Sequence, residues 1–434
     1  MQQQQFSKFV RGFAQFSVAA IAVLAISLAA CGGSTSSGSS GPKNLIIASE
    51  LPVTGTDAGD GVPTQNGVQL AVSQNANLGN GYTLTFLSEN DVSTTTGTHD
   101  PTTGANNIVT LANNPSVMGV VGPFNSNVAG AEIPVANRYG LTLISPSNTN
   151  PGLTLQQYAA ANGFDFSTLH PAGKPDYYFR VCGNDIDQGK LDAKIASSPP
   201  ISAKTAFVID DNEAYGVGLA NFFTTYFQQD GGTLVGTRQS ISLSQASTFP
   251  TLAQNIVNAH PSVIFYGGVT SNGAPQLKAQ VDKAGGQNIP WVGGDGIADD
   301  PSWITQGGAD AFNVTGTVAA PDVGTLAKSN AAAQTFVQQY TAKFGSAPIP
   351  YSAMSYDAAM IEITAIKDLI SAGKPVTRAA VRDEIAGLTY SGVTGNISFD
   401  SNGDNKGSKF YSIYYADPTS KQWVFETQID TSTL

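Results

Sequence analysis

Short apolar segments alternate with segments of helical spacing along most of this chain, and this alternation limits the folds available to it. The first half contains four apolar segments separated by three amphipathic ones. The predicted strands are 44–52, 82–90, 117–123 and 141–146, and the predicted helices are 63–77, 100–114 and 127–140. Strands joined by helical crossovers form parallel sheets with helices on both faces. We therefore predict a doubly wound α/β lobe.

The same order of elements starts again near residue 206, which predicts a second lobe. Its predicted strands are 206–211, 233–241, 262–268 and 289–296, with a helix at 214–231. Two helices at 330–345 and 351–373 and two hairpin-like strands at 409–417 and 421–428 close the chain. About 390 residues follow the N-terminal segment, which is more than one ordinary core holds.

The first thirty residues have the pattern of a secretory signal peptide. Lys8 and Arg11 precede an apolar run that ends at Cys31. About 18 apolar residues also suffice for a transmembrane anchor, which is the alternative. The ending Leu-Ala-Ala-Cys resembles a bacterial lipobox, and this resemblance implies a diacylated Cys31. Residues 31–43 then read as the lipidated Cys and a Gly/Ser-rich tether.

The charge of the chain excludes some partners. The sequence has 21 Lys and Arg against 32 Asp and Glu, and residues 1–30 hold two of the basic residues, so the remainder carries 19 − 32 = −13. Without a basic patch to neutralise phosphates, we expect no nucleic-acid partner. Cys182 is the only thiol besides Cys31, so a lipidated Cys31 leaves no intrachain disulfide.

Catalytic and cofactor motifs are mostly absent. The sequence has no G-x-S-x-G elbow and no phosphate-binding loop, and the half dinucleotide fingerprint at 216–218 has Asn221 at its third glycine position. We expect the paired carboxylates at 210–211 and 299–300 to have surface and capping roles. The three histidines lack metal spacing and are predicted at the surface; they are His99, His170 and His260. We therefore predict no enzyme, no metal and no cofactor.

Several predicted strands end in polar or Gly-rich loops. The segment LTLISPSNTNP (141–151) begins as a strand and ends in small polar residues and proline. Similar endings occur in VVGPFNSN, VIDDNEAYG, FYGGVTSN and VGGDG. Either these are ordinary turns, or they form one ligand cleft, because ligands in open α/β sheets bind beyond the carboxyl ends of the strands. Five such endings favour the cleft.

The polar segments carry a family resemblance that covers nearly all of residues 44–434. The segments that carry it are LISPSNTNPGLT, VVGPFNS, FRVCGNDIDQG (179–189) and DDNEAYGVGLA. The chain resembles the branched-chain amino acid-binding family of ABC-transporter substrate-binding lipoproteins. This implies a type I periplasmic-binding-protein fold, in which two doubly wound α/β lobes meet at a multi-strand hinge. The implied lobes are 44–182 plus 318–408 and 183–317 plus 409–434.

The resemblance also implies a function. The protein is expected to be an extracytoplasmic, lipid-anchored monomer. It is expected to bind an amino acid between its lobes and deliver it to a permease served by an ATPase. The first alternative is a sensory module that binds an amide or urea, and the second is an enzyme on an α/β scaffold. A permease gene nearby would favour transport, whereas turnover of a ligand would favour the enzyme.

The resemblance assigns six ligand-binding residues. The first three come from the first lobe. Ser126 is expected to bind the ligand carboxylate at a helix N-terminus, Ser147 to offer a backbone group, and Thr149 to offer hydroxyl and backbone atoms. The others are a second-lobe tyrosine, an acidic residue facing the α-ammonium, and an aromatic residue of the side-chain pocket. In this order they are Ser126, Ser147, Thr149, Tyr215, Asp295 and Tyr351. The alternatives are capping, turn and packing roles.

Some positions depart from the family pattern. Asp60 stands where the family has an aromatic residue over the ligand side chain, and Val269 stands where it has a second tyrosine. Asn125 occupies a disulfide position of the best-known members, and residues 155–176 are longer than usual. The side-chain pocket is therefore expected to differ, so leucine, isoleucine or valine is not assumed. Asp60 either favours a polar or cationic side chain or is an exposed loop residue.

Overall fold

The computed structural model describes residues 43–407 and 409–431. The predicted signal peptide and Cys31 lie outside these ranges. Among the described residues, no helix combines the length and apolar character required to cross a bilayer.

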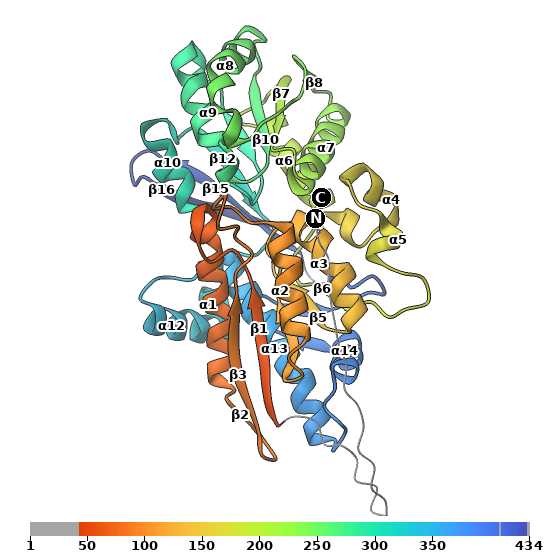
Figure 1. Cartoon of the computed structure of the whole chain (residues 1–434). Helices are drawn as coiled ribbons and strands as arrows, with labels where there is room; N and C mark the ends of the chain where they lie inside the picture. Colours follow the sequence, from red (N-terminus) through yellow and green to blue (C-terminus); the bar gives the residue numbers. More distant parts are fainter. Residues whose placement is uncertain (1–42, 408, 432–434) are drawn as a thin grey trace, which may run out of the picture. The chain divides into compact units, whose positions relative to one another are not determined.

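The first sheet is parallel except for one short edge strand (Figure 1). Its order is β2-β3-β1-β4-β5-β6, and β2 alone runs antiparallel to its neighbour. The strands are β1 (Asn44–Glu50), β2 (Asn77–Gly79), β3 (Tyr82–Glu89), β4 (Val117–Val121), β5 (Thr142–Ser145) and β6 (Tyr178–Arg180). The four predicted strands of this lobe are thus confirmed, and β2 and β6 are additions.

Helices cover both faces of the first sheet. Neighbouring residues of β1 show why: Ile47 belongs to one apolar cluster and Ala48 to another, because successive side chains of a strand point to opposite faces. On one face lie α1 (Ala58–Gln74), α13 (Pro350–Ser371) and α14 (Arg378–Gly387). On the other lie α2 (Pro101–Ala112) and α3 (Ser126–Tyr139). This arrangement is the predicted doubly wound lobe.

The second sheet has the order β16-β15-β12-β11-β10-β7-β8, with β9 also paired to β7. From β12 to β8 the strands are parallel, whereas β15 and β16 form an antiparallel hairpin that extends the sheet. The strands are β7 (Thr205–Asp210), β8 (Thr233–Leu234), β9 (Gln239–Ser240), β10 (Val263–Gly267), β11 (Trp291–Gly293), β12 (Val314–Val318), β15 (Phe410–Asp417) and β16 (Gln422–Asp430). The predicted C-terminal hairpin is confirmed.

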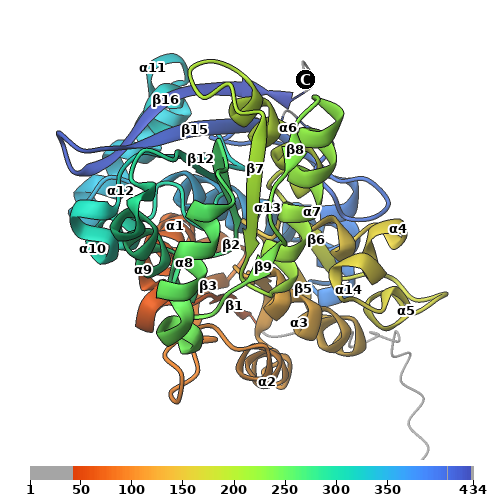
Figure 2. The same cartoon turned by 90° about the horizontal axis from the view of Figure 1, so that it is seen from above.

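The second sheet is also covered on both faces, as Figure 2 shows from above. One side carries α6 (Asp185–Ser197) and α7 (Ala214–Gln229). The other carries α8 (Phe249–Asn258), α9 (Ala274–Val281) and α10 (Pro301–Gly307). The predicted fold class, two doubly wound α/β lobes, is therefore confirmed.

The remaining elements are short or lie at the edges. Helix α11 (Val323–Ser329) begins beside the hairpin of the second sheet, and α12 (Ala331–Phe344) lies beside α1. Strand β13 (Thr389–Ser391) pairs with β14 (Asn396–Ser398). The segment 155–176 contains α4 (Gln156–Ala159), η3 (Ala160–Asn162) and α5 (Phe166–Leu169). The other short 3-10 helices are η1 (Gly55–Asp57), η2 (Pro151–Leu153), η4 (Leu243–Thr248), η5 (Thr270–Asn272) and η7 (Gly308–Asp310), and η6 (Asp282–Gly286) is a short π-helix.

Two predicted elements differ from the structure. The helix predicted at 63–77 begins at Ala58, and Gly61 permits this because a Cβ there would lie 1.9 Å from the Pro52 carbonyl oxygen. The strand predicted at 233–241 is wrong, since it consists of two strands of two residues each. Gly236 separates them with φ of 69°, a conformation outside the β region.

Three chain crossings connect the two sheets, after β6, after β12 and before β15. They lie side by side: Asn405 Nδ2 donates to the Val181 carbonyl at 2.9 Å, and Ser412 Oγ donates to the Ala320 carbonyl at 2.8 Å. This arrangement agrees with a multi-strand hinge. The lobe boundaries at 182, 317 and 408 stay predictions.

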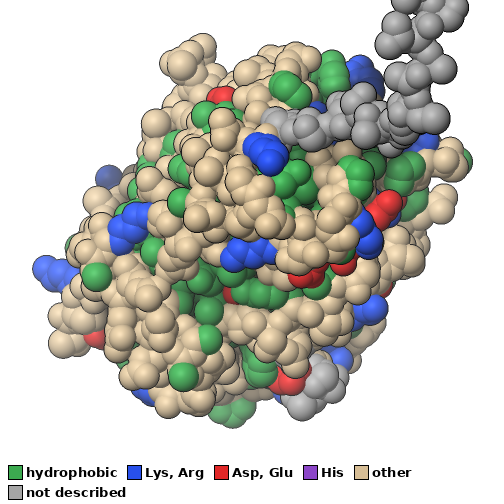
Figure 3. All heavy atoms as spheres, turned by 90° about the horizontal axis from the view of Figure 1, so that it is seen from below, with side chains coloured by type: hydrophobic (Ala, Val, Ile, Leu, Met, Phe, Trp, Pro, Cys, Tyr) green, Lys and Arg blue, Asp and Glu red, His purple; other side chains and the backbone are tan. Residues whose placement is uncertain are grey.

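One face of the molecule is shown in Figure 3, viewed from below. Lys and Arg side chains are scattered singly over this face among acidic and apolar ones, and they do not gather into one basic area. This face therefore offers no stripe of positive charge of the kind that binds a nucleic-acid backbone.

Candidate functional site

Side chains from both lobes meet at Asp295, which follows β11. Tyr215 from α7 donates its hydroxyl to Asp295 Oδ1 at 2.9 Å. Tyr351 from α13, which packs on the first sheet, donates to Asp295 Oδ2 at 2.5 Å. All three side chains are buried. The structure therefore brings three of the six predicted site residues into direct contact.

The environment of Asp295 favours a cationic partner. Burial raises the pKa of its carboxyl, and hydrogen bonds from Tyr351, Tyr215 and Gln188 lower it only in part. Burial also raises the pKa of both tyrosines well above 10, so both remain hydroxyl donors. A buried carboxylate is stabilised by a positive charge in contact with it.

A second carboxylate, Asp185, faces the same place. It is the first residue of α6, its side chain is fully buried, and neither oxygen has a hydrogen-bond partner among the described residues. Burial raises its pKa well above the usual value, and the Asp295 charge raises it further. The Thr149 hydroxyl lies close enough to lower this pKa, although it makes no hydrogen bond of good geometry. The Asp185 amide donates to the Thr149 carbonyl at 2.9 Å.

Ser126 and Ser147 lie on the other side of the predicted site. Ser126 is buried at the first position of α3, and the capping position belongs to Asn125, so the capping alternative for Ser126 is wrong. Ser147 donates its hydroxyl to the Phe124 carbonyl at 3.0 Å, and its amide donates to Ser145 Oγ at 3.2 Å. No described hydrogen bond joins Ser126 to the other predicted residues.

The sequence does not predict Asp185 as a site residue, because the segment that contains it contributes only to the family resemblance. The segment FRVCGNDIDQG contains two acidic residues, and nothing in its spacing distinguishes Asp185 from Asp187. The sequence also does not predict Gln188, which lies in the same segment. Its side chain donates to the Thr317 carbonyl at 3.2 Å and to the Thr317 hydroxyl at 3.1 Å. Asp185 differs from Asp187 in being fully buried at the first turn of α6, and only the structure shows this burial.

The prediction that His99 lies at the surface is wrong. Its Nδ1 lies 2.9 Å from Asp57 Oδ2 in the first lobe, and its Nε2 lies 2.8 Å from Glu213 Oε2 at the start of α7. Burial lowers the pKa of His99, but the charges and hydrogen bonds of Glu213 and Asp57 outweigh it and raise the pKa well above 6.5. Asn127 Nδ2 also donates to Glu213 Oε2 at 3.1 Å. His99 is therefore a link between the lobes.

The other two histidines differ from each other. His260 is exposed, as predicted. His170 is half-buried, with Nε2 at 2.6 Å from the Leu153 carbonyl and Nδ1 at 3.0 Å from Asp176, so its surface assignment is wrong. No three His, Cys, Asp or Glu side chains among the described residues are placed to hold a metal ion.

Asp210, Asp211 and Asp300 accept from backbone amides, in agreement with the predicted capping role, but all three are buried. Asp211 accepts from the Glu213 amide at 3.0 Å, and Asp300 accepts from the Ser302 amide at 2.7 Å and caps α10. Asp210 is buried against Arg238. The predicted surface position is therefore wrong for these three residues, and Asp299 is half-buried.

Asp60 is not an exposed loop residue. It lies half-buried in the first turn of α1. Burial, followed by the charges of Asp300, Asp299, Asp57 and Asp295, raises its pKa well above the usual value. Within the described residues it makes no ion pair. The position that departs from the family pattern thus adds an acidic side chain near the candidate site.

A separate groove of about 690 Å³ lies between α3, the segment 155–176 and the start of α7. Asn127, Phe164 and Glu213 are among its lining residues, and none of the six predicted site residues lines it. The groove is therefore distinct from the cluster around Asp295.

Two doubly wound lobes with a polar site where they meet define the class of two-lobed solute-binding proteins. Residues 47–421 match the family model of periplasmic binding proteins. The chain belongs to the periplasmic binding protein family, whose members are substrate-binding proteins of ABC-type transporters and not enzymes. Membership implies an extracytoplasmic location. The predicted family is confirmed.

Several known proteins are similar to this chain. Leu/Ile/Val-binding protein homolog 1 of Brucella abortus is 27% identical over 379 residues, covering 85% of this chain and 90% of that protein. A leucine binding protein, LivK, from Thermotoga maritima is 25% identical with a TM-score of 0.73, covering 90% of this chain and 100% of the other. LivJ from Streptococcus pneumoniae, in complex with isoleucine, is 22% identical with a TM-score of 0.70, covering 89% and 99%.

Proposed function

We propose that this chain binds an amino acid between its lobes and delivers it to the permease of an ABC importer. The observation that carries the proposal is the pair of buried carboxylates, Asp185 and Asp295, beside the Thr149 hydroxyl. Neither carboxylate makes an ion pair within the described residues. An ammonium group has three donors and one positive charge, which suits two carboxylates and a hydroxyl.

The opposite end of the ligand would bind at the start of α3. Ser126 stands at the first position of this 14-residue helix, where free N–H groups and the helix dipole favour an anion. A carboxylate held there, with the Ser147 backbone beside it, would complete the recognition of a zwitterion. We assign Ser126 and Ser147 to the ligand carboxylate and Thr149, Asp185 and Asp295 to the ammonium group.

Closure would complete the site from the second lobe. Tyr215 and Tyr351 contact one carboxylate from opposite lobes, so their arrangement depends on how the lobes approach each other. We propose that the lobes are 44–182 plus 318–408 and 183–317 plus 409–434, and that they rotate about the three crossings. A ligand that bridges the lobes stabilises the closed state, and the permease recognises that state.

The relatives are named for leucine, isoleucine and valine, and we propose a branched-chain or related amino acid as the ligand. The half-buried Asp60 adds the alternative of a polar or cationic side chain. These two alternatives are separated by measuring leucine and arginine binding to the D60N variant. Loss of arginine binding alone in D60N assigns Asp60 to the ligand side chain, whereas unchanged binding removes it from the site.

We further propose that Cys31 is lipidated and that the protein acts as a monomer at the outer surface of a bacterial membrane. The lipobox-like ending before Cys31 supports this proposal. Metabolic labelling with a radioactive fatty acid tests it: the full-length protein should incorporate label, and C31A should not. Label retained in C31A contradicts lipidation at this residue.

The central experiment is calorimetric titration of residues 41–434, which form one compact unit. The protein is unfolded and refolded to remove bound ligand and is then titrated with the twenty amino acids, urea and short amides. D295N should weaken the binding of the preferred amino acid by about 100-fold, since loss of a buried charged partner costs about 2–5 kcal/mol.

D357N is the matched control, because Asp357 is also a buried carboxylate but binds the backbone of residues 393 and 394. It should lower stability and leave affinity unchanged. Binding of an uncharged amide alone would contradict the amino acid proposal and favour the sensory alternative. Absence of binding to every compound would contradict both.

A further inference from the structure

Arg180 is the last residue of β6, and its guanidinium is buried beneath the turn that carries Thr149. Its side chain is 1% exposed, and its Nε donates to Asp404 Oδ1 at 2.7 Å. Burial alone would lower the pKa of this guanidinium, but the Asp404 carboxylate raises it above its usual value. Arg180 is therefore a charged side chain held in the interior by one ion pair.

The other donors of Arg180 are directed at the ligand-binding turn. Nη1 donates to the carbonyls of Asn148 and Asn150, at 2.8 Å each, so one nitrogen holds both neighbours of Thr149. Nη2 donates to Thr154 Oγ1 at 2.7 Å. These contacts fix the backbone on both sides of the residue that presents its hydroxyl and carbonyl to the site.

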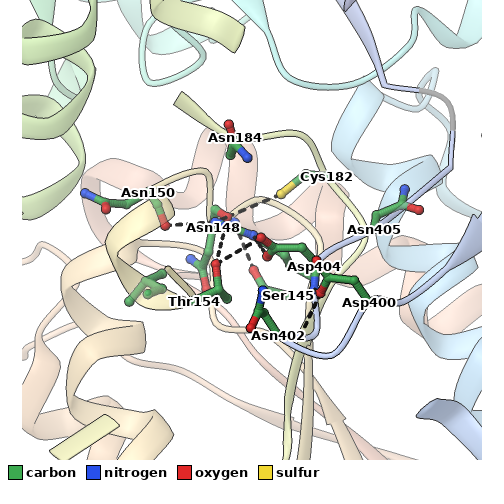
Figure 4. Close-up of polar contacts among 12 residues, drawn as sticks. Ser145, Asn148, Asn150, Thr154, Cys182, Asn184, Asp400, Asn402, Asp404 and Asn405 are labelled. Carbon is green, nitrogen blue, oxygen red and sulfur yellow. Dashed lines mark hydrogen bonds and ion pairs between the residues drawn. The ribbon is translucent and has the colours of Figure 1, made fainter. Parts of the chain in front are cut away.

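Asp404 belongs to a loop that is far away in sequence. It lies in the third crossing between the lobes, 224 residues from Arg180 in the chain. Its second oxygen accepts from Thr154 Oγ1 at 3.1 Å, and its amide donates to Asp400 Oδ1 at 3.0 Å. Figure 4 shows Asn148 and Thr154 beside Asp404, with Asp400 on the other side of Asp404. The Arg180 guanidinium thus links the turn to the third crossing.

We propose that Arg180 and Asp404 are positioning residues that set the geometry of the 147–150 turn and so determine ligand affinity. Four donor contacts in a fixed planar fork reach four acceptors at once, which a lysine ammonium cannot reproduce. Neither residue is among the proposed ligand contacts, so the pair would act through Thr149. The affinity part of this inference rests on the proposed function, whereas the positioning part does not.

Hydrogen exchange in the ligand-free protein tests the positioning directly. In R180K, the peptide containing residues 145–155 should exchange about 10-fold to 100-fold faster, because hydrogen bonds to a charged group hold this segment closed. R378K is the matched control: Arg378 donates to the carbonyls of Val117, Ala112 and Asn114 at the end of α2, away from the site. It should leave the 145–155 peptide unchanged. Equal protection of this peptide in R180K and in the unmodified protein overturns the proposal.

Affinity provides the second readout. D404N keeps the shape of Asp404 and removes its charge, and it covers the case in which R180K does not fold. Both R180K and D404N should weaken the preferred amino acid by about 10-fold or more, whereas R378K should lower only the melting temperature. Normal affinity in folded R180K and D404N overturns the role in binding. If the unmodified protein binds none of the amino acids, the proposed function fails, and the exchange experiment still decides the positioning.

Discussion

At the scale of single residues, Asp185 is a carboxyl group whose burial we expect to cost stability. Its carboxylate is fully buried, has no described hydrogen-bond partner and lies near the Asp295 charge. Each of these features destabilises the protein without a ligand, and none contributes to packing. Under the proposed function, a cation between the two carboxylates would offset this cost.

D185N should therefore raise the stability of the ligand-free protein and lower its affinity. Removal of the buried charge should add about 1–2 kcal/mol to the free energy of unfolding at pH 7, whereas loss of an ammonium partner should weaken binding by about 2 kcal/mol. Thermal unfolding and calorimetry measure the two effects. D357N serves again as control, since it removes hydrogen bonds and should lower stability. A fall in stability of ligand-free D185N would contradict the unpartnered state of Asp185.

At the scale of elements, α7 meets the first lobe through its first two turns. Gly218 is the close point, because a Cβ there would lie 2.8 Å from Asn150 Nδ2 and 2.7 Å from Asn162 Oδ1. Asn150 Nδ2 also donates to the Ala214 carbonyl at the start of α7, at 2.6 Å. We therefore expect the packing of α7 to limit how closely the lobes approach.

G218A should obstruct closure without unfolding either lobe. Alanine favours a helix over glycine by about 1 kcal/mol, so the ligand-free protein should be as stable or slightly more stable. Ligand affinity should fall by about 10-fold, because overpacking at a close contact costs about 1–3 kcal/mol. G387A is the control, since a Cβ at Gly387 meets nothing within 4 Å. Unchanged affinity in G218A would show that α7 does not limit closure.

A second contact between elements joins η1 to the start of α7 through His99. Asp57 and Glu213 flank the ring, and Asp91 also lies within reach of its charge. Because the pKa of His99 is raised above 6.5, its charge stabilises the joined lobes fully below pH 6.5, and this contribution is lost as the pH rises through the raised pKa.

Affinity should therefore decrease with rising pH above neutrality, and H99Q should flatten this profile. Calorimetric titration between pH 6 and pH 10 measures the effect, with the exposed His260 changed to Gln as control. A profile that is identical in H99Q and in the unmodified protein would contradict the role of His99 as a link between lobes.

At the scale of the whole molecule, buried carboxyl groups couple folding to pH. Glu50 and Glu132 are fully buried against each other, and burial followed by the charge of Glu50 raises the pKa of Glu132 well above 4.5. A raised carboxyl pKa contributes stability that is complete below pH 4.5 and is lost as the pH rises through the raised value. The protein should thus lose stability on the alkaline side.

E132Q should stabilise the protein at pH 8 more than at pH 5. Glutamine retains a donor toward Glu50 and cannot ionise, so the expected gain at pH 8 is about 1–2 kcal/mol in the free energy of unfolding. Urea unfolding at both pH values measures it, and E426Q, at an exposed position, is the control. An equal effect of E132Q at both pH values would contradict a raised pKa for this group.

The sequence by itself determined the two lobes, their parallel sheets and the polar ends of the strands. These features depend on local periodicity and on turn residues, which are visible within a window of a few residues. The sequence does not predict strand β12 (Val314–Val318), because Gly316 interrupts an already short apolar run. The resemblance contributed Tyr215, Asp295 and Tyr351, which the structure brings into contact.

Only the tertiary structure decided which charged groups are buried and which groups they face. His99 is predicted at the surface but joins the two lobes. Asp185 has the pattern of an ordinary helix-start acid but is fully buried beside Asp295. Arg180 pairs with a residue 224 positions away. The physical reason is that burial and pairing depend on segments distant in the chain, and a local pattern carries no information about them.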